Sequence, residues 1–270
     1  MASIPCISTE IEESDQQIGE YPLQDTLGYG QYAAVYASML PDRPDEPLAI
    51  KAINKDKLVD LVALHRMSSE IAALRDPGLY HHSILALKEV IHTRRFIYLI
   101  TERGGKDLFE YFGARESGLP EAILKPLVHR VALAIETLHR HQYCHRDLKP
   151  ENILYAPDHP VEDHVVKLVD FGLCTKGDTL LSEFCGSPGF FAPEILLQEQ
   201  YDGRQADIWS LGCILLELLV GNDRFATMWM SMYELDTLKD RTRFAELVEK
   251  VQRVSHASHE HRTHYQPWIL

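Results

Sequence analysis

The stretch HRDLKPEN, residues 145–152, joins three kinds of reactive side chain within eight positions. It places the carboxylate of Asp147 five positions before the amide of Asn152, with the cation of Lys149 between them. A hydroxyl that attacks a phosphate needs a base to orient it, a cation to neutralise the moving charge and an oxygen to bind a metal. The same residues are also compatible with a charged surface loop, so their interpretation depends on the flanking segments.

The segment VVKLVDFG, residues 165–172, supplies a second carboxylate. Its apolar residues form a short strand-like run that ends at Asp170, and Gly172 permits a tight turn directly afterwards. A carboxylate at the end of a strand is well placed to bind a metal. Because it follows HRDLKPEN at the distance of two short strands, Asp170 predicts a metal position beside Asp147.

Two glycines open the segment LGYGQYAAVYA, residues 27–37. Gly28 and Gly30 would let the backbone lie close over phosphates, and Val35 could cover a flat ring. A simple hairpin turn is the commoner cause of such a pair of glycines. The run LAIK, residues 48–51, supports a hairpin whose returning strand ends in the cation of Lys51.

Helical spacing follows in residues 61–78, with apolar residues at 61, 64, 67, 71 and 74 and a stop at Pro77–Gly78. Glu70 lies on this helix, nineteen residues after Lys51. Paired with Lys51, it would hold the lysine at a phosphate. Unpaired, it is a solvated helix acid, and the sequence leaves both alternatives open.

The remaining pattern predicts a strand-rich half followed by a helical half. Residues 84–92 and 94–101 read as two antiparallel strands, and Gly104–Gly105 form a natural hinge. Residues 124–142 then carry one apolar stripe of a long helix, in which Pro126 requires a first-turn position or a kink.

Composition indicates a folded, soluble chain of one domain or two small lobes. It has 270 residues, 45% of them hydrophobic, and a formal net charge of −13. This charge disfavours nucleic acid as a non-specific partner and favours basic peptides, although acidity that serves solubility alone is equally compatible.

Five cysteines form no CxxC pair and follow no secretory leader, so we expect a reducing intracellular compartment, cytoplasmic or nuclear. The longest apolar run, residues 214–220, is interrupted by Glu217 and is too short to span a bilayer. We expect a buried helix there and no membrane insertion.

Taken together, the motifs resemble the eukaryotic protein kinase family. The resemblance covers roughly residues 21 to 225, and seven motifs keep the family's order. They are GYGQYAAV, AIK, Glu70, HRDLKPEN, DFG, APE at residues 192–194 and DIWSLG from Asp207.

This resemblance implies an α+β, two-lobed fold with ATP held between a small β-rich lobe and a larger helical lobe. The expected division is a flexible acidic tail over residues 1–20, the small lobe over 21–103 and the large lobe over 104–270. The part after about residue 222 is shorter than usual, and its end, QPWI, is similar to the family's last helix.

The resemblance also implies a role for each catalytic position. Asp147 would be the catalytic base, Lys149 would contact the γ-phosphate, and Ser187 would bridge the two. Lys51 would bind the α- and β-phosphates and pair with Glu70. Asn152 and Asp170 would bind Mg²⁺, with Mn²⁺ as an alternative.

For the nucleotide, the resemblance implies that Val35, Ala49 and Leu154 enclose the adenine. The backbone from Glu102 to Gly104 would hydrogen-bond its edge, and Thr101 is similar to the gatekeeper residue at the back of the pocket. Leu27, Gly28 and Gly30 would cover the nucleotide from the glycine-rich loop.

KPEN and GSPGFFAPE make the chain more similar to serine/threonine kinases than to tyrosine kinases, nearest the calcium/calmodulin-dependent group. Asp107 and Glu151 match positions at which members bind a basic residue near the acceptor. The resemblance thus implies protein substrates with Ser or Thr hydroxyls in a basic context, and a monomer is the default expectation.

Several departures from the family pattern matter. Ala33 replaces the third glycine of the phosphate loop. Thr175, Thr179 and Ser182 are phosphorylatable, but Glu183 occupies the usual activating position, where Arg146 would face a permanent carboxylate. We therefore hypothesise a loop that is ordered without phosphorylation.

Two alternatives remain beside an active protein kinase. One is an inactive kinase-like scaffold, because the partner of Glu194 is not identified: Arg253, Arg262 and His259 are candidates. The other is a small-molecule kinase, against which the APE segment argues.

Overall fold

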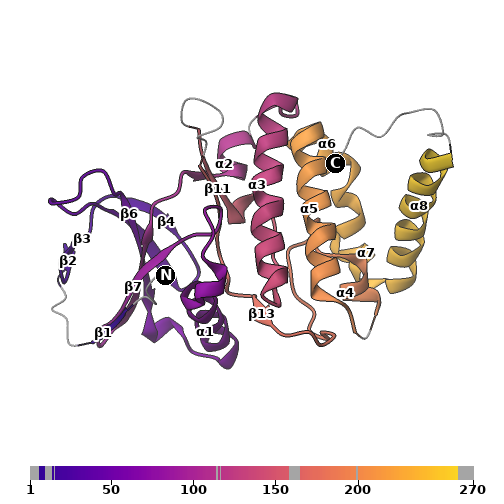
Figure 1. Cartoon of the computed structure of the whole chain (residues 1–270). Coiled ribbons are helices and arrows are strands. Elements are labelled where there is room, and N and C mark those ends of the chain that lie inside the picture. Colours follow the sequence, from indigo (N-terminus) through magenta and orange to yellow (C-terminus); the bar gives the residue numbers. More distant parts are fainter. Residues whose placement is uncertain are drawn as a thin grey trace.

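The chain folds into a β-rich lobe and a helical lobe that lie side by side (Figure 1). This computed structural model describes residues 6–9, 14, 16–113, 115, 117–157, 165–198 and 200–260. The expected α+β, two-lobed fold is therefore confirmed.

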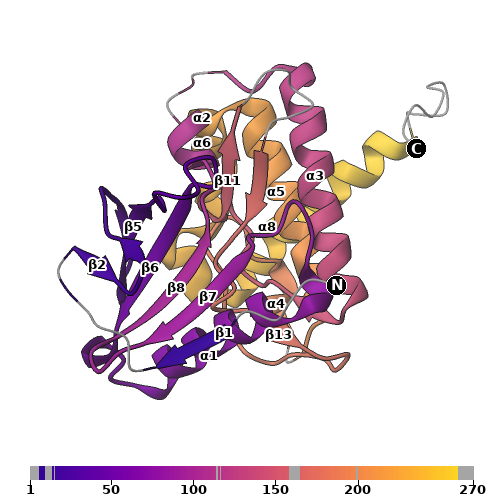
Figure 2. The same ribbon diagram turned by 60° about the vertical axis from the view of Figure 1, so that its left-hand side comes forward.

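A six-stranded sheet, in the order β1-β7-β8-β6-β5-β4, forms the small lobe. Its strands are β1 (Cys6–Thr9), β4 (Thr26–Tyr29), β5 (Ala33–Ser38), β6 (Leu48–Asn54), β7 (Leu87–His92) and β8 (Phe96–Glu102). Helix α1 (Leu61–Arg75) packs beside this sheet (Figure 2). A short hairpin of β2 (Gln17–Ile18) and β3 (Tyr21–Pro22) lies between β1 and β4 in the chain. The two strands expected over residues 84–101 are confirmed as the antiparallel pair β7 and β8.

Part of the N-terminal segment, which the sequence predicts as an acidic tail, is paired with the sheet. Strand β1 runs parallel to β7, with Cys6 opposite Glu89 and Thr9 opposite His92. The edge of a sheet offers unpaired backbone groups that any extended segment can use. Backbone pairing of this kind leaves no apolar repeat in the sequence, which is why residues 1–20 gave no such signal.

Helix α1 buries only part of its apolar stripe. Leu61 is 83% exposed and Leu64 is 42% exposed, whereas Ala63, Glu70 and Ala73 are buried. Only the last three of the five stripe positions pack on the small-lobe core, as partly buried residues. The expected helix is confirmed from its N-cap, Asp60, to Arg75, but the leucines Leu61 and Leu64 at its start do not face the core.

The large lobe is built around the long helices α3 (Glu121–Arg140) and α5 (Gly203–Val220), both of which contribute to its largest core. The other helices are α2 (Leu108–Phe112), α4 (Pro193–Leu197), α6 (Asn222–Met228), α7 (Leu235–Lys239) and α8 (Arg241–Glu260). Pro126 lies inside α3, in its second turn rather than its first. Figure 1 shows α4, α7 and α8 on the side of this lobe that faces away from the small lobe.

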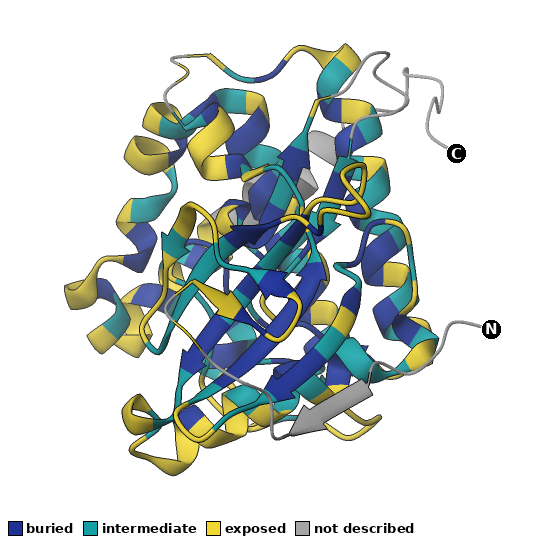
Figure 3. Ribbon diagram, turned by 90° about the vertical axis from the view of Figure 1, so that its left-hand side faces the viewer, coloured by how far each residue is buried: buried dark blue, intermediate teal, exposed yellow. Residues whose placement is uncertain are grey.

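Short strands place the reactive loops between the lobes. Strands β9 (Lys106–Asp107), β11 (Ile153–Ala156) and β12 (Val165–Leu168) form one small sheet, and β10 (Tyr143–Cys144) pairs with β13 (Thr175–Lys176). Single-turn 3-10 helices complete the path at Lys55–Lys57, Pro77–Leu79, Pro150–Asn152 and Met230–Tyr233. Figure 3 shows that strands β5, β6, β7 and β8 of the large sheet carry mostly buried and intermediate residues.

The predicted similarity of QPWI, residues 266–269, to a last helix lies outside the described residues. The same is true of Arg262 and of the side chains of Arg253 and His259, the three candidate partners of Glu194.

Candidate active site

The loop of residues 145–152 is anchored by a buried carboxylate. Asp207, on α5, accepts the backbone N–H groups of His145 and Arg146 at 2.8 Å each. The ring nitrogen Nε2 of His139 lies 2.9 Å from the same carboxylate. Arg146 has a φ of 66°, a left-handed conformation that a side chain adopts only where its surroundings hold it. The loop is therefore a rigid platform rather than a solvated charged loop.

On this platform a hydroxyl bridges the acid and the cation. The Ser187 hydroxyl donates to Asp147 Oδ1 at 2.7 Å, and Lys149 Nζ donates to the Ser187 hydroxyl at 3.0 Å. Lys149 Nζ also lies 3.5 Å from Asp147 Oδ2. Ser187 comes from a segment forty residues later, so the structure brings together the three residues that the sequence predicted to act as one group.

Asn152 directly precedes β11, and Asp170 lies two residues after the end of the neighbouring strand β12. Val169 N–H donates to the Asn152 carbonyl at 3.0 Å, which fixes the two segments against each other. The side-chain amide of Asn152 donates to the Asp147 carbonyl at 2.8 Å, so that its oxygen remains available as a ligand. Asp170 has a φ of 61° and accepts the N–H of Gly172 at 3.3 Å.

These two oxygen ligands fit a divalent cation that keeps waters and phosphates as its other ligands. Within the described part of the chain, no cluster of three or more His, Cys, Asp or Glu side chains could hold a metal ion by itself. The donor set therefore suits a hard cation that arrives with a phosphorylated substrate.

Lys51 and Glu70 form the ion pair that the sequence left open. Lys51 Nζ lies 2.6 Å from Glu70 Oε1 and 2.7 Å from Oε2. Burial alone would lower the pKa of Lys51, but attraction to Glu70 and Asp170 outweighs it and raises this pKa. Strand β6 and helix α1 are thus joined at a charged position that faces Asp170.

A cleft of about 580 Å³ opens between the lobes beside this pair. Nine of the ten residues predicted for the nucleotide line it: Leu27, Gly28, Val35, Ala49, Lys51, Thr101, Glu102, Gly104 and Leu154. Gly30 does not line the cleft, and its N–H instead donates to the Ala33 carbonyl at 2.8 Å in the hairpin turn.

Close packing explains one glycine at the back of this cleft. A side chain on Gly104 would come within 2.6 Å of Leu154, which therefore closes against the hinge. Leu74, Leu85 and Leu99 also line the cleft, behind the small Thr101. The volume and the apolar walls fit a flat aromatic ring with a charged tail directed at Lys51 and Asp170.

The hinge carries a contact that the sequence analysis missed. Glu102 Oε1 accepts the N–H of Ala86 at 2.7 Å and pairs with Lys167 Nζ at 2.8 Å. Ala86 follows α1, and Lys167 lies on β12 of the large lobe. The Glu102 carboxylate thus joins the hinge to both lobes. In the sequence, only the alternation of apolar and polar residues in β12 indicated that Lys167 would face away from the core.

In the segment between DFG, residues 170–172, and APE, residues 192–194, Glu183 contacts Arg146. Arg146 Nη1 lies 3.0 Å from Glu183 Oε2, and Arg146 Nε donates to the Leu173 carbonyl at 2.7 Å. The hydroxyl of Tyr201 donates to the Glu183 carbonyl at 2.8 Å. Thr179 and Ser182 are exposed nearby.

The two acids predicted to bind substrate differ in their surroundings. Asp107 caps α2, accepting the Glu110 N–H at 2.7 Å, and lines the mouth of the cleft. Glu151 is exposed beside the loop of Asp147. Sequence analysis missed a third acid, Glu217, whose only signal was that it interrupts an apolar run.

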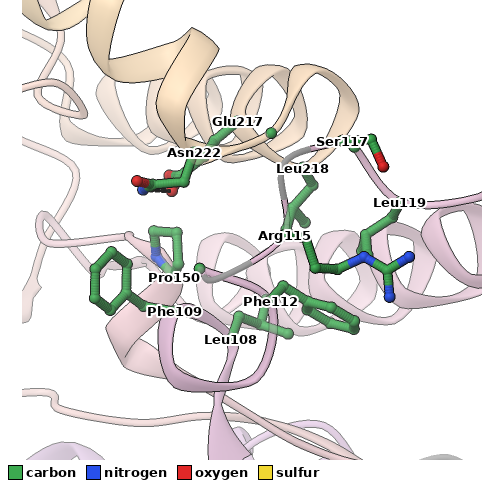
Figure 4. A pocket seen from close by; sticks show the side chains of 13 residues that line it. Leu108, Phe109, Phe112, Arg115, Ser117, Leu119, Pro150, Glu217, Leu218 and Asn222 are labelled. Carbon is green, nitrogen blue, oxygen red and sulfur yellow. Dashed lines mark hydrogen bonds between the residues drawn. The ribbon is translucent and has the colours of Figure 1, made fainter.

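Glu217 lies in a small hollow of about 20 Å³ between α2 and the end of α5 (Figure 4). Phe109, Pro150 and Leu218 are among the residues that surround it. Burial raises the pKa of Glu217, opposed by a hydrogen bond from Asn222, and the charge of Glu151 adds to the rise. Two acids are thus close enough to repel each other beside the reactive loop.

Within the described residues, no helix combines the length and the apolar character needed to cross a bilayer.

Comparisons with known proteins agree with this geometry. The family model described as protein kinase domain matches residues 21–263. The SNF-related serine/threonine-protein kinase of Rattus norvegicus is 39% identical over 210 residues, which is 77% of this chain and 27% of that protein.

Two further relatives are similar at comparable levels. Serine/threonine-protein kinase unc-51 of Caenorhabditis elegans is 35% identical over 215 residues, 76% of this chain and 25% of that protein. Probable serine/threonine-protein kinase MARK-A of Dictyostelium discoideum is 36% identical over 207 residues, 76% of this chain and 19% of that protein. The chain therefore spans about a quarter of the length of the curated relatives it matches.

Proposed function

The chain belongs to the protein kinase family, and we propose that it transfers the γ-phosphoryl group of ATP to serine and threonine hydroxyls of protein substrates. The observation that carries this proposal is the hydrogen-bonded chain Asp147–Ser187–Lys149, with distances of 2.7 and 3.0 Å. A carboxylate, a hydroxyl and a cation in contact form a site that can orient an incoming hydroxyl and neutralise phosphoryl charge.

In this proposal Asp147 accepts a hydrogen bond from the substrate hydroxyl and takes its proton. Lys149 neutralises charge on the transferring phosphoryl group, and Ser187 fixes both side chains at the distance that in-line attack requires. The anchoring of the loop by Asp207 supports this assignment, because a base must be held within hydrogen-bond distance of the proton it removes.

For the nucleotide we assign the adenine to Val35, Ala49 and Leu154, and its edge to the backbone of Glu102–Gly104, with Leu27 and Gly28 above it. Lys51, held by Glu70, binds phosphate oxygens. Mg²⁺, or alternatively Mn²⁺, would be held by Asn152 and Asp170, and when bound it supplies positive charge to the phosphates.

The rival reading is a kinase-like scaffold that binds nucleotide and partners without catalysis. The ordered contacts of Asp147, Lys149 and Lys51 favour the enzyme, because a scaffold has no need to hold these charges together. The proposed activity is tested by ATP-dependent labelling of a degenerate peptide library, with wild type compared with Asp147→Asn. We expect the variant to lose at least about 100-fold in rate.

A thermal-shift measurement with ATP provides the folding control for this test. Asp147→Asn keeps the size of the side chain and should still be stabilised by nucleotide, which shows that the variant is folded. Equal labelling by both proteins would overturn the enzyme assignment in favour of the scaffold. Labelling confined to tyrosine peptides would overturn the serine/threonine assignment.

For the substrate we propose a basic residue near the acceptor. Glu151 is exposed, Glu217 is buried beside it, and the chain carries a net charge of −13. A guanidinium placed between the two acids would relieve their repulsion, although side chains must move because the hollow is small. Asp107, at the mouth of the cleft, is assigned to the same preference. The peptide library tests this directly: no enrichment of Arg or Lys would contradict it.

For regulation we propose that Glu183 orders its segment through Arg146 without phosphorylation, and that Thr179 and Ser182 are secondary modification positions. We also propose that the protein acts inside the cell, in the cytoplasm or nucleus, as a monomer. The four cysteines for which the structure gives a state, Cys144, Cys174, Cys185 and Cys213, carry free thiols.

A further inference from the structure

Three consecutive backbone carbonyls, just after the Ser187–Pro188 pair, are each capped by a side chain from another part of the large lobe. The Trp229 indole N–H donates to the Gly189 carbonyl at 2.9 Å. The Ser210 hydroxyl donates to the Phe190 carbonyl at 2.8 Å, and the Tyr233 hydroxyl donates to the Phe191 carbonyl at 3.0 Å. All three acceptor residues are buried, so an uncapped carbonyl there would lack water as a substitute.

The opposite side of this segment is fixed to Ser187 itself. The N–H groups of Phe190 and Phe191 both donate to the Ser187 carbonyl, at 3.1 and 3.0 Å. The Ser187 hydroxyl donates to Asp147. A continuous set of hydrogen bonds therefore leads from Trp229 and Tyr233, through residues 189–191, to the proposed base.

Trp229 and Tyr233 belong to the region after residue 222, which departs most from the family pattern. Their rings lie 6.3 Å apart, and Tyr233 meets Phe191 edge-on at 5.0 Å and Phe244 at 5.7 Å. Trp229 also lies 6.0 Å from Trp209 of α5. These contacts hold both donors rigidly, since aromatic rings packed on several sides have little freedom to rotate.

Gly189 shows how closely this region approaches the segment. It has a φ of +90°, a conformation that L side chains rarely adopt, and a side chain there would come within 2.2 Å of Met230 Sδ. Met230 lies directly after Trp229. The segment is thus shaped on its backbone side to receive the Trp229–Tyr233 turn.

We propose that residues 187–191 hold the substrate peptide, and that Trp229 and Tyr233 are positioning residues that clamp this segment by capping the carbonyls of Gly189 and Phe191. The clamp holds Ser187 against Asp147 and fixes the surface on which the substrate backbone lies. This proposal rests on the proposed function, because that function assigns Ser187 and Asp147 their roles. The proposal gives a role to the region after residue 222, which the assignment of the catalytic residues leaves unexplained.

The test uses two substitutions that remove the donor and keep an aromatic side chain, Trp229→Phe and Tyr233→Phe, alone and together in the full chain; Tyr233→Phe removes the hydroxyl alone, whereas Trp229→Phe also shortens the ring system. We expect the double variant to raise KM for a peptide substrate roughly tenfold, because a lost buried hydrogen bond costs about that factor. KM for ATP should stay within about twofold. Tyr21→Phe is the matched control, since it removes a 2.8 Å phenol hydrogen bond to Glu89 in the small lobe.

A second measurement separates failure of the clamp from failure of the proposed function. Hydrogen exchange at the amides of Phe190 and Phe191 should quicken roughly tenfold in the double variant and stay unchanged in Tyr21→Phe. This readout needs no catalysis. Unchanged exchange in the double variant would overturn the clamp even if the wild-type protein is an active enzyme. Faster exchange in the double variant, together with an inactive wild-type protein, would overturn the proposed function alone.

Kinetics discriminate positioning from a merely structural role. If the clamp acts through Ser187, then the double variant should add little to the loss already caused by Ser187→Ala, because both changes release the same group. Full additivity of the two losses, or an equal rise of both KM values, would contradict the proposed positioning role and indicate general destabilisation of the lobe.

Discussion

Arg146 and Glu183 form an ion pair of unequal burial, with the Arg146 side chain 4% exposed and that of Glu183 70% exposed. Arg146 precedes the proposed base directly, and Glu183 lies in the segment that leads to Ser187. A buried guanidinium needs a partner, and Glu183 and the Leu173 carbonyl supply it. The pair therefore links the reactive loop to the following segment through a charge that no other enzyme has to add.

Glu183→Gln should lower kcat roughly 3- to 10-fold. Because Glu183 is exposed, the pair contributes little, since exposed ion pairs are worth at most about 1 kcal/mol. The burial of Arg146 increases this contribution, because a buried charge that loses its partner is costly. The measurement is peptide phosphorylation by protein made without other kinases and shown by mass spectrometry to be unphosphorylated. Ser182→Ala is the control and should leave kcat within about twofold. Wild-type protein that is inactive until phosphorylated would contradict the prediction.

Ser187→Ala should lower kcat about 10- to 100-fold, whereas Ser187→Thr should stay within about threefold of wild type. Both of the hydroxyl's hydrogen bonds, at 2.7 and 3.0 Å, are to charged groups, and such bonds are worth about 1.5–3 kcal/mol. The threonine variant keeps the hydroxyl. Steady-state kinetics with one peptide checks the pair, and equal losses in both variants would show that packing, not the hydroxyl, is responsible.

Glu70→Gln should raise KM for ATP and lower thermal stability, because it leaves the partly buried Lys51 without its charge partner. Breaking a buried pair costs about 3–5 kcal/mol, and the 31% exposure of Lys51 places the cost below that range. The double variant Lys51→Met/Glu70→Leu should melt higher than either single variant. Melting temperatures measured without nucleotide check this, and a double variant less stable than both singles would refute the argument.

Local spacing made much of the site predictable. Asp147, Lys149 and Asn152 lie within a few residues of one another, so any compact loop brings them together. Lys51 and Glu70 were predicted as a pair only conditionally, because the sequence shows the helix but not its rotation. The structure decides this, since α1 turns Glu70 inward and leaves Leu61 83% exposed.

Contacts that depend on tertiary packing gave no local signal. The parallel pairing of β1 with β7 joins segments about eighty residues apart through backbone groups alone. Trp229 caps a carbonyl forty residues away, and nothing in its own neighbourhood marks it as a donor. Glu217 looked like an interruption of a buried helix, and only the fold shows that Glu151 lies close to it.

Recognition of basic peptides should strengthen as pH rises above the ordinary carboxyl value of 4.5, because burial raises the pKa of Glu217 and its ionised form binds a cation. The same raised pKa of Glu217 makes the folded state less stable as pH rises, whereas peptide recognition strengthens. A raised carboxyl pKa stabilises the folded state fully below the unfolded value, and this contribution is lost as pH rises through the folded value.

Glu217→Gln tests both effects. In Glu217→Gln, KM for the basic peptide should not change as pH rises above 4.5. The unfolding free energy of this variant should also lack the decrease with rising pH that Glu217 causes in wild type. Kinetics with an Arg-containing peptide and its Arg→Ala version provide the control, since the neutral peptide should not distinguish the two proteins. A pH-independent KM in wild type would contradict the assignment.

Lys167→Met should raise KM for ATP roughly 3- to 10-fold with little change in kcat. The Lys167–Glu102 pair is mostly buried, with side chains 12% and 26% exposed, and Glu102 lies in the hinge that is assigned to the adenine edge. Without Lys167 the Glu102 carboxylate keeps the Ala86 N–H but loses its contact with β12, so one side-chain contact between the hinge and the large lobe is lost. Glu102→Gln should raise KM for ATP by a similar factor. The double variant Lys167→Met/Glu102→Gln should raise it by much less than the product of the two single effects, because both substitutions remove the same interaction.

The matched control for this last prediction is Lys176→Met, which breaks a pair of the same length, 2.8 Å, to Asp76, where Lys176 is 53% exposed. Because exposed pairs contribute little, this variant should bind ATP like wild type. Isothermal titration with a non-hydrolysable nucleotide measures the affinity without catalysis. Equal weakening in Lys167→Met and Lys176→Met would mean that net charge, rather than the hinge contact, controls nucleotide affinity.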